Sequence, residues 1–230
     1  MSEVDYSNFC FGKDLAVVDP DLDLIIRFEE ERQARRLILI PSESIAPKPV
    51  REALGSVFNN IYAEGWPPLR MTREEERRLL DFGRQLAYYR RYADRRFYKG
   101  ADYVHFVETL AQRRAAQCFA TERVPADAIF VNVQALSGAA ANTAVYDALL
   151  EPGDTLMGMD LFQGGHLTHG SEFNISGRRY KVVSYGVNRR TERLDYDQIM
   201  DLAKKYRPRI IVAGYTSYPW APDWKAFREI

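Results

Sequence analysis

The pattern of apolar positions changes once along the chain, near residue 129. Before that point apolar residues recur at helical spacing, as Leu22, Ile25 and Ile26 show. An apolar run that stops at Pro41 is typical of a short strand. The pattern predicts an irregular arm over residues 1–20, a strand over 37–40, and helices over 21–36, 49–58, 72–92 and 103–119.

The second part of the chain alternates regularly between short apolar runs and helical stretches. It predicts strands over residues 129–133, 155–159, 179–185 and 209–213. Between them it predicts helices over residues 139–150 and 195–206, and another that begins after Asp223. Such alternation is typical of a mostly parallel sheet with helices on both faces, so we expect an α/β fold.

The composition limits which partners the protein can bind and in which cellular compartment it is expected. Lysine plus arginine and aspartate plus glutamate number 32 each, so no net charge attracts the chain to nucleic acid or to acidic lipid. No apolar run approaches the ~20 residues of a membrane span, and no secretory leader is expected. Cys10 and Cys118 lie far apart, which favours a reduced, cytoplasmic protein, although one disulfide stays possible.

Three loops follow predicted strands and should therefore meet at one edge of the sheet. They cover residues 134–138, 160–170 and 214–219. Ser137 and Gly138 open a helix and offer an anion site, His166 lies in a glycine-rich loop, and Thr216 supplies a hydroxyl. Taken singly, each is equally an ordinary cap or structural residue. Together they predict a pocket for a phosphorylated aromatic cofactor.

Several long motifs resemble one known family. They include LIPSES at 39–44, NIYAEG at 60–65, VNVQALSGAAAN at 131–142, EPGDT at 151–155, GGHLTHG at 164–170 and IIVAGYTSYPWAPDW at 210–224. Over about residues 20–230 the chain is similar to serine hydroxymethyltransferase. The resemblance implies the large domain of a fold-type I pyridoxal-phosphate transferase, incomplete at the C-terminus.

The resemblance also assigns the cofactor site. It implies that His166 stacks on the ring of pyridoxal 5'-phosphate and that Thr216 lies near the ring oxygen. Ser137, Gly138 and Ala139 would form the phosphate turn, where the family usually has serine in place of Ala139. The implied reaction interconverts serine and glycine and passes a one-carbon unit to tetrahydrofolate.

Substrate residues follow from the same resemblance. Tyr62 and Glu64 would reach the site from the second subunit of a homodimer or of a tetramer of dimers. A carboxyl such as that of Glu64, placed at a shared and partly dry site, can act as a general acid–base. Ser42 and Tyr98 would lie near the amino-acid carboxylate. The folate would contact Leu161, Gly165 and Leu167.

We expect three segments, namely an N-terminal arm and helical segment over residues 1–60, a dimer and active-site segment over 61–100, and the first part of the cofactor domain over 101–230. The second segment departs from the family pattern by an insertion at about 70–95. The chain ends before the family's Schiff-base lysine, so residues 1–230 alone should be inactive. The alternatives are a folate-independent aldolase for 3-hydroxy amino acids and a non-catalytic relic that binds a partner.

Overall fold

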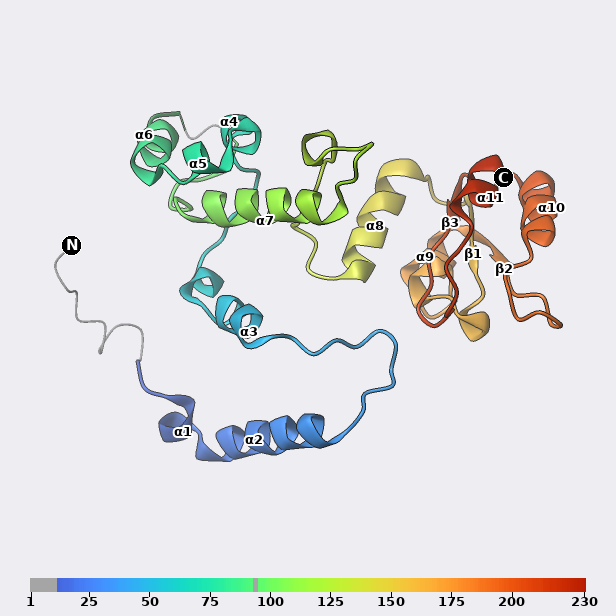
Figure 1. Cartoon of the computed structure of the whole chain (residues 1–230), viewed down its shortest axis with the longest axis horizontal. Coiled ribbons are helices and arrows are strands. Elements are labelled where there is room, and N and C mark those ends of the chain that lie inside the picture. The colour runs from blue at the N-terminus through green and yellow to red at the C-terminus, as the bar shows by residue number, and fades with distance from the viewer. Residues whose placement is uncertain (1–11, 93–94) are drawn as a thin grey trace. The chain divides into compact units, whose positions relative to one another are not determined.

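The computed structural model describes residues 12–92 and 95–230 (Figure 1). Cys10 lies outside the described residues, and Cys118 is exposed as a free thiol. The chain divides between Ile45 and Ala46 into two compact units, which are considered separately. Among the described helices, none has both the length and the apolar character that a membrane span requires.

The described residues of the first unit form two helices followed by a non-helical segment. Helix α1 (Leu15–Val18) lies within the predicted irregular arm, and α2 (Pro20–Arg35) confirms the predicted helix. The side chain of Asp19 caps α2 by accepting a hydrogen bond from Leu22 N. No residue of α2 is buried. The strand predicted at 37–40 is wrong, because the described residues place no strand beside this stretch and Leu37 and Leu39 are exposed.

The second unit begins with helices. Helix α3 (Lys48–Leu54) and the 3-10 turn η1 (Val57–Asn60) replace the single helix expected at 49–58. Three helices replace the one predicted at 72–92, namely α4 (Leu69–Arg73), α5 (Glu76–Leu79) and α6 (Phe82–Tyr92). They gather against α7 (Val104–Phe119), which was predicted (Figure 1). Their shared core consists of Met71, Leu79, Leu86 and Phe106.

The rest of this unit is an α/β body, and its elements follow the predicted order closely. Helix α8 (Gly138–Leu149), strand β1 (Thr155–Met159), helix α10 (Tyr196–Tyr206) and strand β3 (Ile210–Val212) were all predicted. So was α11 (Trp224–Glu229), capped by Asp223. The expected strand at 179–185 is shorter, because α9 (Ile175–Arg179) precedes β2 (Lys181–Tyr185).

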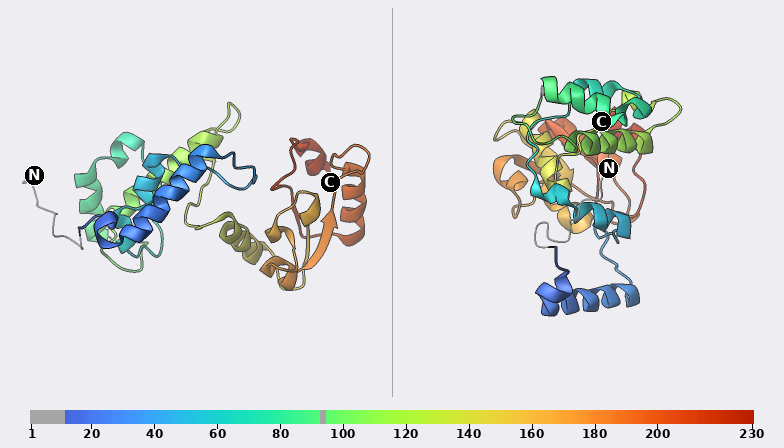
Figure 2. Two further views of the ribbon diagram at one scale, coloured as in Figure 1. Left: turned by 90° about the horizontal axis from the view of Figure 1, so that it is seen from below. Right: turned by 90° about the vertical axis from the view of Figure 1, so that its left-hand side faces the viewer.

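Within the described residues, three strands form a parallel sheet in the order β2-β1-β3. Alternate residues of β1 face opposite ways, as a pleated strand requires. Met157 and Met159 pack with residues of α10 and α11, whereas Leu156 packs with Tyr146 and Leu150 at the C-terminal end of α8. Helices therefore cover both faces of the sheet (Figures 1 and 2), and the predicted α/β class is confirmed.

The strand predicted at 129–133 is wrong. The described chain places no neighbouring strand beside it, and the Phe130 side chain is 96% exposed. A 3-10 turn, η2 (Ala126–Ala128), precedes this extended stretch. Apolar composition alone does not make a strand, because strand backbone groups need hydrogen-bonding partners.

Candidate functional site

The first wall of the candidate site is the N-terminal turn of α8. Ser137 caps this helix, since its Oγ accepts a hydrogen bond from Ala140 N at 3.2 Å. The amides of Gly138 and Ala139 are the first two of the helix and have no intrahelical acceptor. Two free amides at the positive end of a twelve-residue helix can bind a phosphate.

The second wall is the loop that carries His166. Its Nδ1 accepts a hydrogen bond from Thr168 N at 3.1 Å and lies 2.8 Å from Thr168 Oγ1. Thr168 is buried and in turn accepts from Asn142 Nδ2 of α8 at 2.8 Å. The imidazole is therefore held by its Nδ1 side. A ring fixed in this way can offer its face to a flat ligand.

The third wall is the loop after β3. Thr216 N and Ser217 N both donate to Gly164 O, at 2.9 and 3.2 Å. Gly164 itself adopts a φ of 120°, which favours glycine. The loops that carry His166 and Thr216 are thus joined through the backbone at the carboxyl ends of two neighbouring strands.

These three walls line one open hollow of about 600 Å³. It is lined by Ser137, Gly138, Ala139, Asn142, His166, His169, Val212, Ala213, Gly214, Tyr215 and Thr216. The convergence expected from the three loops is therefore present, even though no strand precedes the first loop. The residues fit pyridoxal 5'-phosphate, because free amides, a fixed imidazole and a hydroxyl suit its phosphate, ring and ring oxygen.

The lining residues that were not among the predicted site residues include Asn142 and His169. Asn142 lies one helical turn beyond Gly138, a spacing that could have indicated it. His169 is buried, and its Nδ1 accepts a hydrogen bond from His166 N at 3.2 Å. Burial, together with the nearby His166, lowers the pKa of His169 to about 4. His169 is therefore neutral near pH 7 and supports the loop.

The described residues contain no group of three or more potential metal ligands.

The residues assigned to folate occupy the same loop. Leu161 is half-buried and Leu167 is exposed, but neither lines the hollow. Gly165 has an independent structural reason to be glycine. A Cβ on it would lie 2.0 Å from Met159 O, far inside van der Waals contact. The glycine is thus required by backbone packing, whatever ligand approaches it.

The residues assigned to substrate lie elsewhere in the described chain. Tyr62, Glu64 and Tyr98 are exposed and do not line the hollow, although Glu64 N donates weakly to the Tyr98 hydroxyl at 3.5 Å. Ser42 is exposed and belongs to the first unit. The structure therefore brings together the predicted cofactor residues but not the predicted substrate residues.

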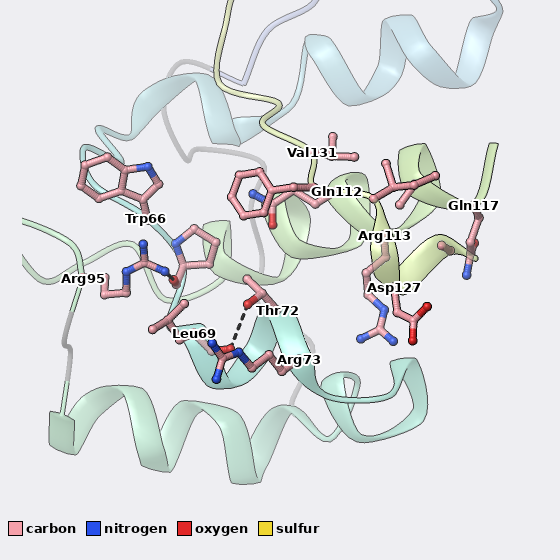
Figure 3. A pocket seen from close by; sticks show the side chains of 15 residues that line it. Trp66, Leu69, Thr72, Arg73, Arg95, Gln112, Arg113, Gln117, Asp127 and Val131 are labelled. Carbon is pink, nitrogen blue, oxygen red and sulfur yellow. Dashed lines mark hydrogen bonds between the residues drawn. The ribbon is translucent and has the colours of Figure 1, made fainter. Parts of the chain in front are cut away.

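A second hollow of about 710 Å³ lies between α4, α7 and η2 (Figure 3). Three arginines line it, namely Arg73, Arg95 and Arg113, together with Asp127 as the single acid. Arg95 donates to Pro67 O and lies over the ring of Trp66. The Arg113 Nη1 atom is buried, and the described residues offer it no hydrogen-bond partner. None of the predicted site residues belongs to this hollow.

Comparison with known proteins agrees with the geometry. The family model for serine hydroxymethyltransferase matches residues 15–90 and 75–230, and the two matched segments overlap within the stretch expected to be an insertion. A serine hydroxymethyltransferase of Methylococcus capsulatus (strain Bath) is 41% identical over 222 residues, which cover 96% of this chain and 45% of that protein. The chain spans about half the length of this curated relative. It belongs to the serine hydroxymethyltransferase family.

Proposed function

We propose that this protein interconverts serine and glycine, with pyridoxal 5'-phosphate as cofactor and tetrahydrofolate as acceptor of the one-carbon unit. The activity is that of the whole protein, since the chain covers about half the length of its curated relative. One observation supports the proposal most directly. The helix end at Ser137, the fixed imidazole of His166 and the hydroxyl of Thr216 line a single hollow.

Each lining group has a separate task in this proposal. The amides of Gly138 and Ala139 hold the phosphate, and Ser137 keeps the turn in place. His166 stacks on the ring, and Thr216 donates to the ring oxygen. When bound, the cofactor acts as an electron sink for the breaking and forming of the carbon–carbon bond.

The substrate residues would act from a neighbouring subunit. Tyr62 is 77% exposed and Glu64 is exposed as well, so both side chains are free to enter the site of a second copy. In a homodimer or a tetramer of dimers, Glu64 would act as general acid–base. Ser42 and Tyr98 would bind the amino-acid carboxylate, and Leu161, Gly165 and Leu167 would contact the folate.

The cofactor site can be tested by replacing its lining groups in the full-length protein. We expect His166→Asn and Thr216→Val each to weaken binding of pyridoxal 5'-phosphate about tenfold, because stacking or one hydrogen bond is lost. Ser217→Ala is the matched control, since Ser217 neighbours Thr216 but does not line the hollow. Equilibrium dialysis measures the affinity. Equal affinities in all three variants would contradict the proposed site.

The reaction can be tested through Glu64. We expect Glu64→Gln to lower folate-dependent conversion of serine to glycine by about 100-fold or more, because a proton carrier is lost. Turnover is followed by the glycine formed, with and without tetrahydrofolate. Unchanged turnover would exclude the acid–base role. Equal turnover without tetrahydrofolate would favour the aldolase alternative.

A further inference from the structure

The guanidinium of Arg96 is the centre of a buried polar network. Its side chain is 1% exposed and pairs with Glu108, Nη2 to Oε2 at 2.5 Å. Its Nε donates to His105 Nδ1 at 3.4 Å, and its Nη1 donates to Ala63 O at 2.5 Å and to Gly65 O at 2.9 Å. A buried cation needs such partners, because desolvation otherwise makes it costly.

The two carbonyls held by Arg96 belong to the residues on either side of Glu64. The same loop is also bound through its backbone, since Trp66 N donates to Arg95 O at 2.9 Å and Phe97 N donates to Glu64 O at 3.3 Å. Gly65 adopts a φ of 98°, and a Cβ on it would lie 2.2 Å from Arg95 O. The loop that presents Glu64 is therefore fixed by both backbone and side-chain contacts.

Gln134 extends this network toward the phosphate turn. Its Nε2 donates to Gly65 O and to Glu108 Oε1, each at 2.7 Å. Gln134 precedes Ser137 by three residues, and three residues of extended chain span at most about 11 Å. One amide group therefore connects the loop of Glu64 to the segment that leads into the helix end of α8.

We propose that Arg96 and Gln134 are positioning residues that fix the loop from which Glu64 reaches the site of the neighbouring subunit. This inference rests on the proposed function, because it requires Glu64 to take part in the reaction. A misplacement of about 1 Å can cost a reaction step about 100-fold, so a rigid loop behind the proton carrier has a direct effect on rate. A buried ion pair adds little net stability, but removal of one partner leaves an uncompensated buried charge.

The test compares Gln134→Met with Gln117→Met in the full-length protein. Methionine keeps the length of glutamine but removes the amide. Gln117 is exposed on α7 and has no hydrogen bond through its side chain among the described residues, so it is the matched control. We expect amide hydrogen exchange at Trp66 and Phe97 to rise at least tenfold in Gln134→Met only. Unchanged exchange would overturn the proposal.

Steady-state kinetics distinguish a residue that positions Glu64 from one that only stabilises the folded protein. We expect Gln134→Met to lower kcat about tenfold or more, with little change in KM for serine, and to have no further effect when Glu64 is already glutamine. The proposal would be overturned if Gln134→Met lowered kcat equally in the wild type and in Glu64→Gln, or if it left kcat unchanged in the wild type. Arg96→Lys should restore only part of the rate lost in Arg96→Met, because lysine keeps the charge but not the fork of donors.

These outcomes remain distinct from failure of the proposed function. A wild-type protein without serine–glycine activity would refute the reaction and, with it, the kinetic role of the network. The exchange measurement still reports whether Gln134 holds the Glu64 loop, because it does not depend on turnover.

Discussion

At residue 139 a methyl group lines the hollow where a serine hydroxyl would be able to donate to a phosphate. Ala139 is the second residue of α8, so its amide remains available at the helix end. The site therefore depends on backbone donors more than the family pattern implies. Restoring the hydroxyl is a small change that leaves the helix intact.

We expect Ala139→Ser to tighten binding of pyridoxal 5'-phosphate about tenfold in the full-length protein. A hydrogen bond to a charged group contributes about 1.5–3 kcal/mol, part of which is lost in ordering the side chain. Ala144→Ser is the control, because Ala144 is exposed on the same helix and does not line the hollow. Equal affinities for both variants would show that a hydroxyl at residue 139 does not bind the phosphate.

Two histidines should make stability depend on pH. Burial lowers the pKa of His105 to about 4, and the neighbouring Arg96 adds to the effect. The pKa of His169 is also about 4. In the unfolded chain both would titrate near 6.5, so the unfolded state binds more protons between pH 6.5 and 4. Their contribution is complete above about pH 6.5 and is lost as pH falls toward 4.

The loss should reach about 3 kcal/mol for each histidine, at about 1.4 kcal/mol per unit of pKa shift. Unfolding by urea, measured at several pH values between 7.5 and 4, reports it as a falling midpoint. His105→Gln and His169→Gln should each flatten this dependence. A variant that keeps the full slope of the wild type would show that its histidine does not cause it.

Among the elements, the break between α4 and α5 shows how side chains far apart decide local structure. Glu74 and Glu75 are extended, so the chain turns where the sequence predicts one continuous helix. The turn lets Glu74 bind Arg70 at 2.7 Å and also accept a hydrogen bond from the buried Gln85 of α6. Pairing between Glu74 and residues of two separate helices therefore accompanies the break.

We expect Glu74→Ala to destabilise this helical region by about 2 kcal/mol, because the buried amide of Gln85 loses a charged partner. Glu75→Ala is the matched control, since Glu75 is exposed and makes no side-chain hydrogen bond or ion pair among the described residues. The free energy of unfolding measures both variants. Equal values would mean that the hydrogen bond to Glu74 contributes nothing to stability.

At the scale of the whole molecule, much apolar surface is exposed in both units. Leu22, Ile25 and Phe28 of α2 are more than 40% exposed, as are Leu37 and Leu39. In the second unit Phe97, Phe119 and Phe130 are more than 70% exposed. Surfaces of this kind usually contact other protein.

We expect residues 1–230, expressed alone, to associate as concentration rises and to bind a hydrophobic dye. They should also show no covalent adduct with pyridoxal 5'-phosphate. Light scattering, dye fluorescence and absorbance measure these properties, with the full-length protein as reference. A monomer that stays soluble and unfolds cooperatively would contradict this expectation.

The sequence by itself determined the features that depend on residues close together in the chain. Periodicity and caps gave α2, α7, α8, α10 and α11, and the alternation after residue 129 gave the parallel α/β class. The motifs around His166 gave the family, whose large domain is of fold-type I. The same reasoning placed His166 and Thr216 at one edge, because parallel strands end together. Ser137 joins them although the strand expected before it is absent from the described residues.

Only the tertiary structure decided which apolar runs became strands and which polar residues came together. Residues 37–40 and 129–133 have strand-like composition but no partner strand within 12–92 and 95–230, and strand hydrogen bonds cannot form within one segment. Arg96, Glu108 and Gln134 look ordinary along the chain, yet they meet around Gly65. Local patterns are set by adjacent residues, whereas pairing and burial depend on segments that only folding brings into contact.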